Sequence, residues 1–373
     1  MSERLAFVVE SGTDVRLVDG LAERFEVSVL ARRISGGREI NWEPTHPVSV
    51  TVGPESRLRF AYWASRRLTG FDFILVQGYG LAALATNMAG RHRLHPPVML
   101  VCSPAERYYA ARRDNPVPGK PFHRRELAMI TRVARWNGKI GSKYVALSEH
   151  LAEVIRSHEP EGAINVIPVY GVDTEHFRPT ERSRAEIRRE LGLPETGSLA
   201  FFSSRVAPEK DAATLAAAAG RVIRTGRDVR FLNLGGGHRE FMALAEREGI
   251  ADRVIARDAV HPLRDLPAYY QASDLCIQAS REEGLGFAPL EALACDVPVV
   301  AAAVGGLAET IIPHESGWTY DVGDTAGLVR AIIEVLDHPQ EGLRRARAGR
   351  ELVRMRYEKR VVFERLAEVL TAR

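Results

Sequence analysis

The 373-residue sequence has few cysteines and no long apolar run. Its three cysteines, Cys102, Cys276 and Cys295, are far apart and odd in number. They predict neither a disulfide framework nor a zinc site, and they favour a reducing compartment. No segment approaches the roughly 20 apolar residues of a membrane-spanning helix, and the apolar run that starts at Leu5 is too short for a secretory signal peptide. We therefore expect a cytoplasmic protein.

The sequence also lacks a large excess of charge of either sign. Lys and Arg number 51 against 48 Asp and Glu, a net charge of +3. No nucleic-acid-binding module accompanies this balance, so we do not expect nucleic acid as a partner. Segment 107–143 departs from it, with ten basic residues against two acidic ones and with aromatic residues between them. Three readings stay open: a solvated face, contact with anionic lipid headgroups at the inner membrane face, or binding of an anionic or polysaccharide acceptor.

Low-complexity tracts and short repeats are absent, and apolar runs alternate with helical patterns. The length suits two domains, each with its own core. The predicted strands are 5–9, 27–30, 48–52, 73–76, 98–102, 144–147, 165–167, 199–203, 229–234, 254–256, 275–278 and 299–302. Helical patterns lie between them, for example at 15–25, 58–68, 124–137 and 211–225. This alternation predicts βαβ units and parallel, doubly wound sheets.

Proline and glycine punctuate segment 168–179, which predicts a domain boundary there. The last segment, from about residue 341 to residue 373, has a helical pattern. We expect one domain at 1–172 and a second at 173–355.

Two carboxylates stand eight residues apart, at Glu283 and Glu291. Glu283 lies in a glycine-rich turn, and Glu291 follows Pro289, which suits the first turn of a helix. A loop with free backbone N–H groups at a helix N-terminus favours an anion, and carboxylates accept hydrogen bonds from hydroxyls. The pattern therefore suits a nucleotide sugar. The alternative is that Glu283 caps a turn and Glu291 faces solvent.

The context of the two carboxylates resembles a known family. Segments 272–280 and 296–309, on either side of the E-x7-E spacing, are similar to the donor-binding core of retaining glycosyltransferases of family 4, the glycosyl transferases group 1. The resemblance runs from about residue 144 to 324. It implies a GT-B fold, in which two Rossmann-like α/β domains face a central cleft and the C-terminal helix, about 356–373, crosses back to the N-terminal domain. It also implies that the C-terminal domain binds the donor and the N-terminal domain mainly binds the acceptor.

Arg205 and Lys210 follow a predicted strand and precede a predicted helix. A planar guanidinium and a point charge both suit a diphosphate, although the segment also fits an ordinary polar loop. It resembles a basic loop of the family, with Ser204 and Asp211 at positions where glycine is usual. The resemblance implies that Arg205 and Lys210 hold the donor diphosphate and stabilise the departing nucleotide.

The resemblance also assigns roles to the remaining donor-site residues. Glu283 is expected to contact the transferred sugar, and Glu291 the ribose hydroxyls. Val260 or His261 is expected near the nucleobase through its backbone, and a loop role for His261 is favoured over a catalytic one. The donor-binding set is Gly12, Gly235, Gly236, Val260, Gly284, Leu285, Gly286, Phe287 and Glu291.

The first half of the chain departs from the family pattern. The loop after the first strand has one glycine, Gly12, where relatives often have two. After the strand that ends at Cys102, the histidine of many relatives is missing, and Ser103 and Glu106 are the candidates for its place near the acceptor. Cys102 has no adjacent base pattern that would support a nucleophile.

These observations predict a retaining hexosyltransferase. It would move a hexosyl unit from a UDP- or GDP-sugar to a hydroxyl of a glycan, glycolipid or small molecule, with no cofactor and no metal. Two alternatives stay open: a nucleotide-sugar epimerase or hydrolase on the same fold, and a catalytically silent nucleotide-binding subunit of a glycosylation complex.

Overall fold

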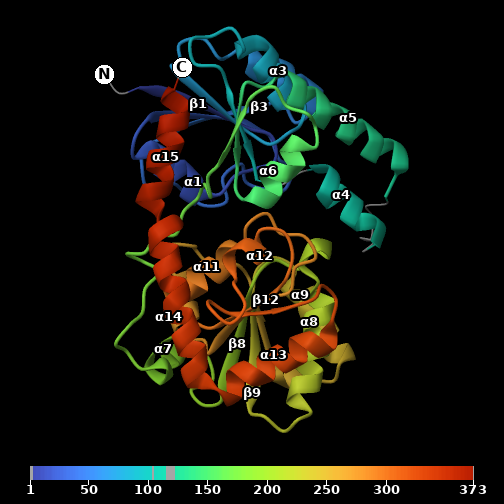
Figure 1. Ribbon diagram of the computed structural model, residues 1–373, viewed down its shortest axis with the longest axis vertical. Coiled ribbons are helices and arrows are strands. Elements are labelled where there is room, and N and C mark those ends of the chain that lie inside the picture. Colours follow the sequence, from blue (N-terminus) through green and yellow to red (C-terminus); the bar gives the residue numbers. More distant parts are fainter. Residues whose placement is uncertain (1–2, 103–104, 115–121, 373) are drawn as a thin grey trace. The chain divides into compact units, whose positions relative to one another are not determined.

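The computed structural model describes residues 3–102, 105–114 and 122–372. It divides the chain into two compact units, Met1–Gly171 together with Lys359–Arg373, and Val172–Glu358 (Figure 1). The sequence predicts the division after residue 172 and the return near residue 356. The structure places them after Gly171 and before Lys359.

The first unit is built on a seven-stranded parallel sheet in the order β3-β2-β1-β4-β5-β6-β7. Its strands are short and mostly apolar on both faces, as a sheet covered by helices requires. They are β1 (Arg4–Val9), β2 (Glu26–Arg32), β3 (Ser49–Gly53), β4 (Phe73–Gln77), β5 (Val98–Val101), β6 (Lys143–Ala146) and β7 (Ala163–Val166).

Helices connect these strands, and polar residues fix where several of them begin. Asp14 and Ser148 accept backbone hydrogen bonds as the N-caps of α1 and α6. The helices of this unit are α1 (Val15–Ala22), α2 (Arg57–Ser65), α3 (Leu81–Gly90), α4 (Ala105–Asp114), α5 (Arg124–Ile140), α6 (Glu149–Arg156) and α15 (Lys359–Thr371).

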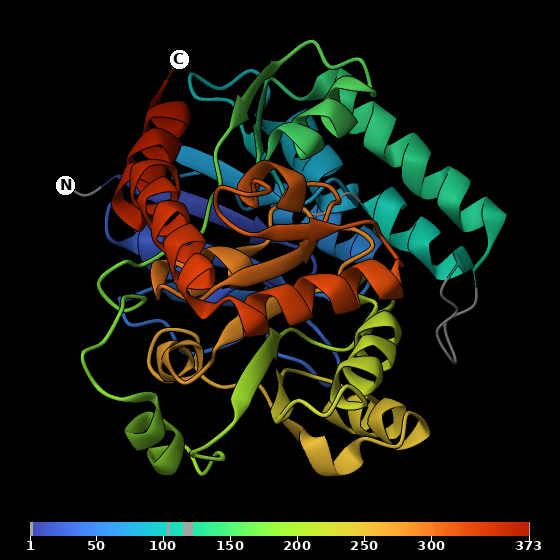
Figure 2. The same cartoon turned by 60° about the horizontal axis from the view of Figure 1, so that its bottom comes forward.

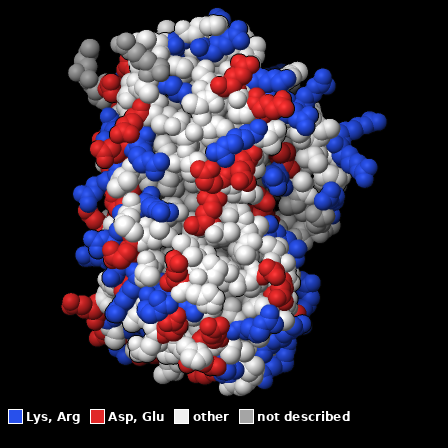
Figure 3. Space-filling model, viewed as in Figure 1, with Lys and Arg blue, Asp and Glu red and all other residues white. Residues whose placement is uncertain are grey.

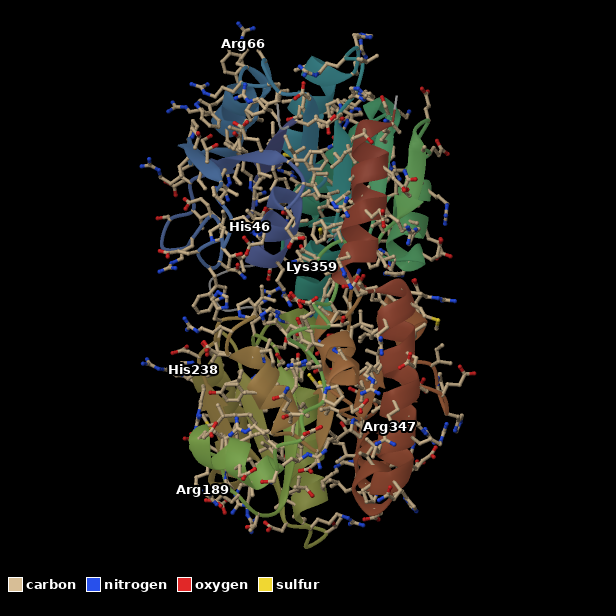
Figure 4. The ribbon with its side chains drawn as sticks, turned by 90° about the vertical axis from the view of Figure 1, so that its left-hand side faces the viewer. His46, Arg66, Arg189, His238, Arg347 and Lys359 are labelled. Carbon is tan, nitrogen blue, oxygen red and sulfur yellow. The ribbon has the colours of Figure 1, made fainter. Side chains whose placement is uncertain are left out.

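The C-terminal helix α15 packs on the first unit, as the family resemblance predicted. The ring of Phe363 fills the space beside Gly20, where an added Cβ atom would lie 2.1 Å from the ring. Lys359, labelled in Figure 4, forms an ion pair with Glu23 at the end of α1. Because Gly20 on α1 has no side chain, the Phe363 ring of α15 can pack directly against α1.

The predicted helix at 341–373 is in fact two helices, α14 (Pro339–Arg356) and α15. Between them, the carbonyl oxygen of Tyr357 accepts a hydrogen bond of 2.6 Å from the N–H of Val172, and Glu358 forms a β-bridge with Val172. This extended pairing interrupts the helical backbone. A periodic pattern in the sequence does not reveal such a break, because it depends on a segment nearly 190 residues earlier in the chain.

The second unit has a six-stranded parallel sheet in the order β10-β9-β8-β11-β12-β13. Its strands are β8 (Ser198–Ser203), β9 (Val229–Leu234), β10 (Val254–Arg257), β11 (Leu275–Gln278), β12 (Val299–Ala302) and β13 (Trp318–Tyr320). The sequence did not predict β13, because its three residues are too few for a recognisable pattern. Both sheets confirm the predicted doubly wound α/β class.

Helices and two short 3-10 turns complete the second unit. They are α7 (Arg184–Glu190), α8 (Ala212–Ile223), α9 (His238–Arg247), α10 (Leu266–Gln271), α11 (Phe287–Ala294), α12 (Leu307–Thr310), α13 (Thr325–Asp337) and α14, with turns at Pro208–Lys210 and Ala251–Arg253. The main core lies between the sheet and α8, α9 and α13. Figure 2 shows α13 and α14 in orange and red. Over the described residues, no helix is both long and apolar enough to cross a membrane.

Candidate functional site

Three loops of the second unit follow the carboxyl ends of neighbouring strands. They are 204–211 after β8, 235–237 after β9 and 279–286 after β11, and these strands are adjacent in the sheet. In open parallel sheets, ligands bind at this edge, where the strand order reverses. Strand β8 has β9 on one side and β11 on the other, so the chain reverses here.

Lys210 and Glu283 form the central ion pair of these loops. The Lys210 Nζ atom lies 2.6 Å from the Glu283 Oε2 atom, and the two side chains are only 14% and 12% exposed. The same carboxylate oxygen accepts hydrogen bonds of 3.1 Å from Gln278 Nε2 and from Ser280 Oγ. Three donors therefore fix this oxygen, and the carboxylate is oriented before any ligand binds.

Arg281 holds the turn that carries Lys210. Its backbone N–H donates to the Glu209 carbonyl oxygen at 2.8 Å, and its Nε lies 2.8 Å from Asp211 Oδ2. Asp211 has a φ of 47°, in the left-handed region, and its side chain accepts hydrogen bonds from Thr214 at the start of α8. Asp211 thus keeps the backbone conformation that glycine adopts readily, and it adds a carboxylate that joins two loops.

Arg205 lies in the same loop and pairs with Glu209 rather than with Glu283. The Arg205 side chain is 61% exposed, whereas the Glu209 side chain is 8% exposed. The buried carboxylate tethers a guanidinium that stays open to solvent. Sequence reasoning missed Glu209, although its four-residue separation from Arg205 was a usable signal.

The glycines of loop 235–237 let it lie directly against loop 204–211. A Cβ atom on Gly235 would lie 2.4 Å from the Ser204 carbonyl oxygen, and Gly235 has a φ of 153°. The carbonyl oxygen of Gly236 accepts a hydrogen bond of 2.7 Å from the N–H of Val206. Gly236 is exposed, with no atom within 4 Å of its Cβ position. This loop shapes the site through its backbone.

The turn 284–287 opens helix α11. Gly286 has a φ of 94° as the N-cap residue, and a Cβ atom there would lie 2.3 Å from Leu307. Leu285 is buried, and Phe287 is the first residue of the helix. The Gly306 N–H donates to the Glu283 carbonyl oxygen at 3.0 Å, and a Cβ on Gly306 would lie 2.4 Å from the Gly284 carbonyl oxygen. The helix N-terminus, with its partial positive charge, thus follows Glu283 directly.

Glu291 is buried, so the alternative that it faces solvent is wrong. Its exposed fraction is 3%, and its Oε2 accepts a hydrogen bond of 3.0 Å from the Tyr270 hydroxyl. Burial, followed by the charge of Glu291, raises the pKa of Tyr270 well above its usual value, so Tyr270 stays a protonated donor. Sequence reasoning missed Tyr270. The predicted ribose contact of Glu291 stays a prediction.

Val260 lies in the loop after β10 and is partly buried. The next residue, His261, accepts hydrogen bonds at Nδ1 from the N–H groups of Leu263 and Arg264, at 3.3 and 3.2 Å. The His261 ring therefore supports the turn before α10, which agrees with the favoured loop role.

The remaining predicted residues belong to the first unit. Gly12 has a φ of 83°, and its carbonyl oxygen accepts a hydrogen bond of 3.4 Å from Gln77 Nε2. Glu106, at the start of α4, has its Oε1 3.0 Å from His158 Nε2, and the two side chains are 12% and 6% exposed. Ser103 lies outside the described residues.

Cys102 is not a reactive thiol in this structure. Burial raises its pKa to about 12, although a hydrogen bond from the Tyr170 hydroxyl, with an oxygen–sulfur distance of 3.5 Å, lowers it. A thiol with this pKa is almost wholly protonated near neutral pH, and the thiolate is the nucleophilic form. Among the residues that the structure describes, no group of three or more His, Cys, Asp or Glu is placed to hold a metal ion.

Residues 183–352 match the family described as glycosyl transferases group 1. The matched segment makes up just under half of the chain. The match covers the strands and loops that position Arg205, Lys210, Glu283 and Glu291. It confirms the resemblance to glycosyl transferases group 1.

Curated relatives of the chain carry glycosyltransferase names. The chain is 31% identical over 223 residues to a GDP-mannose-dependent alpha-(1-6)-phosphatidylinositol monomannoside mannosyltransferase of Mycolicibacterium smegmatis, covering 57% of this chain and 58% of the relative. It is 38% identical over 190 residues to a D-inositol 3-phosphate glycosyltransferase of Acidothermus cellulolyticus, covering 48% and 41%. The aligned part thus spans about half the length of these relatives.

Solved structures show the GT-B fold over nearly the whole chain. A structure of Alr3699/HepE of Anabaena in complex with UDP-glucose has a TM-score of 0.78 at 18% identity and covers 99% of both chains. Sucrose-phosphate synthase of Thermosynechococcus elongatus has a TM-score of 0.77 at 19% identity and covers 98% of both chains. The fold predicted from the sequence is therefore confirmed.

Proposed function

We propose that the protein is a retaining hexosyltransferase that uses a UDP- or GDP-sugar and transfers its hexosyl unit to a hydroxyl acceptor. The observation that carries this proposal is the ion pair between Lys210 and Glu283 beside the N-terminus of α11. It places a cation for phosphate next to an oriented carboxylate for sugar hydroxyls. The match of segment 183–352 to the group 1 family supports the same reaction class.

The donor diphosphate would bind between Lys210, Arg205 and the turn that opens α11. A diphosphate competes for the ammonium hydrogens of Lys210, which now point to Glu283. The exposed guanidinium of Arg205, tethered by Glu209, supplies a planar second cation. Together with the helix N-terminus, these groups would stabilise the charge that develops on the leaving nucleotide.

Glu283 would orient the sugar rather than attack it. Its Oε2 already accepts from three donors, which makes that oxygen a poor nucleophile. In the proposed front-face step, the bond between the anomeric carbon and the leaving phosphate oxygen breaks. The acceptor oxygen forms its bond on the same face, and its proton passes to the leaving phosphate. No metal and no protein nucleophile takes part.

Glu291 would hold the ribose hydroxyls from the buried end of the site. Its carboxylate is positioned by Tyr270, whose ring packs edge-to-face on Phe201 with centroids 5.0 Å apart. Val260, Gly235 and Gly236 would contact the nucleotide through their backbone. The acceptor would bind mainly to the first unit, with Glu106 as a candidate.

The basic segment 107–143 would bring the enzyme to a membrane surface. Its described helix α5 exposes Met129 and Trp136 together with several basic side chains. Figure 3 shows blue side chains gathered along the edge of the first unit where Figure 1 places α5. We propose peripheral contact with the inner membrane face through this segment.

Thermal unfolding with UDP, GDP, ADP and dTDP at equal concentration tests the donor site. A ligand that binds only the folded protein raises its free energy of unfolding by about 2.7 kcal/mol when present at a hundred times its Kd. We expect one nucleotide to raise the Tm clearly. Lys210→Ala should reduce that rise, whereas Lys139→Ala, a control on α5, should leave it unchanged.

Product analysis with the sugar derivative of that nucleotide then distinguishes the transferase from the hydrolase or epimerase and from the silent subunit. Transfer with retained anomeric configuration supports the proposal. Free sugar or an epimer without an acceptor product would indicate the hydrolase or epimerase instead. Nucleotide binding without turnover across an acceptor panel would indicate the silent subunit, and no Tm rise with any nucleotide would contradict the donor site itself.

A further inference from the structure

The second unit has a hollow between its edge strand β13 and helices α13 and α14 (Figure 1). The hollow has a volume of about 370 Å³, which lies within the range of about 300–1,000 Å³ typical of small-molecule sites. Gly327 and Ala331, one turn apart on α13, line it with small side chains and leave room for a ligand. The hollow runs along β13, whereas the donor loops follow β8, β9 and β11.

The charged side chains around the hollow leave no surplus of positive charge. Three carboxylates and two arginines line it: Asp321, Asp324, Glu334, Arg330 and Arg345. The Arg345 side chain is 7% exposed, and its Nε atom lies 2.7 Å from Glu341 Oε1. The Arg330 Nη2 atom lies 3.6 Å from Asp324 Oδ2. An anionic ligand would therefore meet more carboxylates than guanidinium groups, and within the described part of the chain these carboxylates are not placed to hold a metal ion.

The indole N–H of Trp318 is a buried donor that lacks an acceptor. Trp318 lines the hollow and is 5% exposed, and its Nε1 atom has no hydrogen-bond partner among the described residues. The Arg345 Cζ atom lies 3.8 Å from the centroid of the Trp318 ring, and Arg345 Nη1 donates to the Gly317 carbonyl oxygen at 3.1 Å. These contacts hold the ring in place. Since a buried indole N–H usually has a partner, the missing acceptor indicates an oxygen atom supplied from the hollow.

We propose that the hollow binds one neutral hexose unit. Each hydroxyl of a sugar both donates and accepts hydrogen bonds, so one ring can donate to Asp321 and Glu334 and accept from the indole N–H of Trp318. A phosphate offers mainly acceptor oxygens and would be repelled by the carboxylates. An apolar ligand would leave the polar groups of the hollow without partners. None of these residues belongs to the donor site, and the proposal does not depend on the transferase activity.

Saturation-transfer NMR of the full chain with glucose, mannose and galactose tests the hollow. We expect at least one of these hexoses to bind, and its 6-phosphate to bind about tenfold more weakly or worse, because juxtaposed like charges cost binding free energy. The double variant Asp321→Ala, Glu334→Ala should weaken hexose binding by about tenfold or more, since each change removes a hydrogen bond to a charged group. Trp318→Phe removes one neutral hydrogen bond and should weaken binding about fivefold.

Matched variants outside the hollow serve as controls. Glu246→Ala, Asp252→Ala removes two exposed carboxylates of the second unit that do not line the hollow, and Trp136→Phe changes a tryptophan that is 51% exposed on α5. Both should bind the hexose like the unaltered protein, and circular dichroism melting shows whether each variant is folded. Equal binding of the hexose and its methyl glycoside would assign the hollow to a hexose unit within a glycan, whereas tighter binding of the free hexose would assign it to a monosaccharide.

Three outcomes would overturn the proposal. None of the three hexoses could bind, or the 6-phosphate could bind as tightly as its neutral hexose. The hollow variants could also bind normally while Glu283→Gln abolishes binding, which would assign the hexose to the donor site instead. The Tm rise with nucleotide should be the same in the hollow variants as in the unaltered protein. Because it is measured separately, failure of the hollow and failure of the donor site are distinguishable.

Discussion

Each unit has a nearly buried carboxylate paired with a nitrogen base soon after a strand end, Glu283 in the second unit and Glu106 in the first. The Glu283 Oε2 atom accepts from three donors. The Glu106–His158 pair is incomplete: Glu106 Oε2, His158 Nδ1 and the nearby Tyr79 hydroxyl are buried without a hydrogen-bond partner among the described residues. Each such atom costs about 1–3 kcal/mol.

The difference indicates two kinds of site. The Glu283 Oε2 atom is held by its three donors before the ligand arrives, which is what electrostatic catalysis requires, although Gln278 Oε1 in the same network has no hydrogen-bond partner among the described residues. A partly satisfied network keeps open hydrogen-bonding positions, which a polar ligand or water can fill. We therefore infer that the second unit holds a preorganised donor site, and that the Glu106 cluster adapts to what binds near it.

The largest expected effect comes from Glu283→Gln. This change keeps the shape of the side chain but removes the charge that faces Lys210 and the sugar. We expect kcat to fall about 10²–10³-fold, with Tm changed by only a few degrees. Steady-state kinetics beside circular dichroism melting measures both. Glu282→Gln is the adjacent control and should keep nearly full activity; equal losses in the two variants would contradict the role of Glu283.

Glu106→Gln tests whether the carboxylate of the first unit matters less for the rate than Glu283 does. The amide can still bond to His158, so we expect kcat within about tenfold of the unaltered enzyme and a larger change in the acceptor KM than in the donor KM. A kcat loss as large as that of Glu283→Gln would abolish the distinction between the two sites. Initial rates with each substrate varied in turn give this result.

The sequence named a carboxylate of each site, Glu283 and Glu106, but it missed most of the side chains that hold them. Glu283, Gly286 and Lys210 lie in short segments whose residue types indicate a site for phosphate and sugar hydroxyls. Gln278 and Ser280, which donate to Glu283, are local. The partners of the other carboxylates come from elsewhere in the chain: Tyr270 donates to Glu291 across 21 residues, and His158 pairs with Glu106 across 52. Such pairs depend on how the sheet brings strand ends together, which local patterns do not encode.

The helices and strands, too, were predicted where the pattern is local and missed where a distant segment decides the structure. Apolar runs of three to six residues identified most strands, because burial on both faces leaves a continuous pattern. The break between α14 and α15 was missed because Val172, not a local proline or glycine, causes it.

Tyr270→Phe is expected to have a moderate effect on stability. The change removes the hydroxyl that donates to the buried Glu291 carboxylate. We expect the free energy of unfolding to fall by about 1–3 kcal/mol, and the affinity for a nucleoside to fall with it because Glu291 loses its orientation. Urea denaturation and calorimetry measure the two effects. Tyr269→Phe, one residue earlier and also buried, is the control, and an equal loss there would show that the hydroxyl of Tyr270 has no special role.

The smallest expected effect compares a partly buried carboxylate in the first unit, Asp14 (20% exposed), with a more exposed one in the second, Glu341 (35% exposed). Burial raises the pKa of Asp14, but its contacts with Arg16 and Asn41 outweigh this and leave the pKa below its usual value. Hydrogen bonds from Arg344 and Arg345 lower the pKa of Glu341 to about 2. A carboxylate with a lowered pKa in the folded state stabilises the fold above its unfolded pKa, near 4, and this contribution is lost as the pH falls through the folded value.

Asp14→Asn and Glu341→Gln should therefore each flatten the loss of stability between about pH 5 and pH 2. At Asp14 the flattening should be about 1.4 kcal/mol for each tenfold difference between the acid dissociation constants of the folded and unfolded states. Asparagine also keeps the N-cap of α1, so Asp14→Asn changes the charge without changing the cap. Added salt should weaken the Glu341 effect much more than the Asp14 effect, because screening acts mainly on exposed charges. Urea denaturation over this pH range at low and high salt measures the difference, and an equal salt response at the two positions would show that Asp14 is as open to solvent as Glu341.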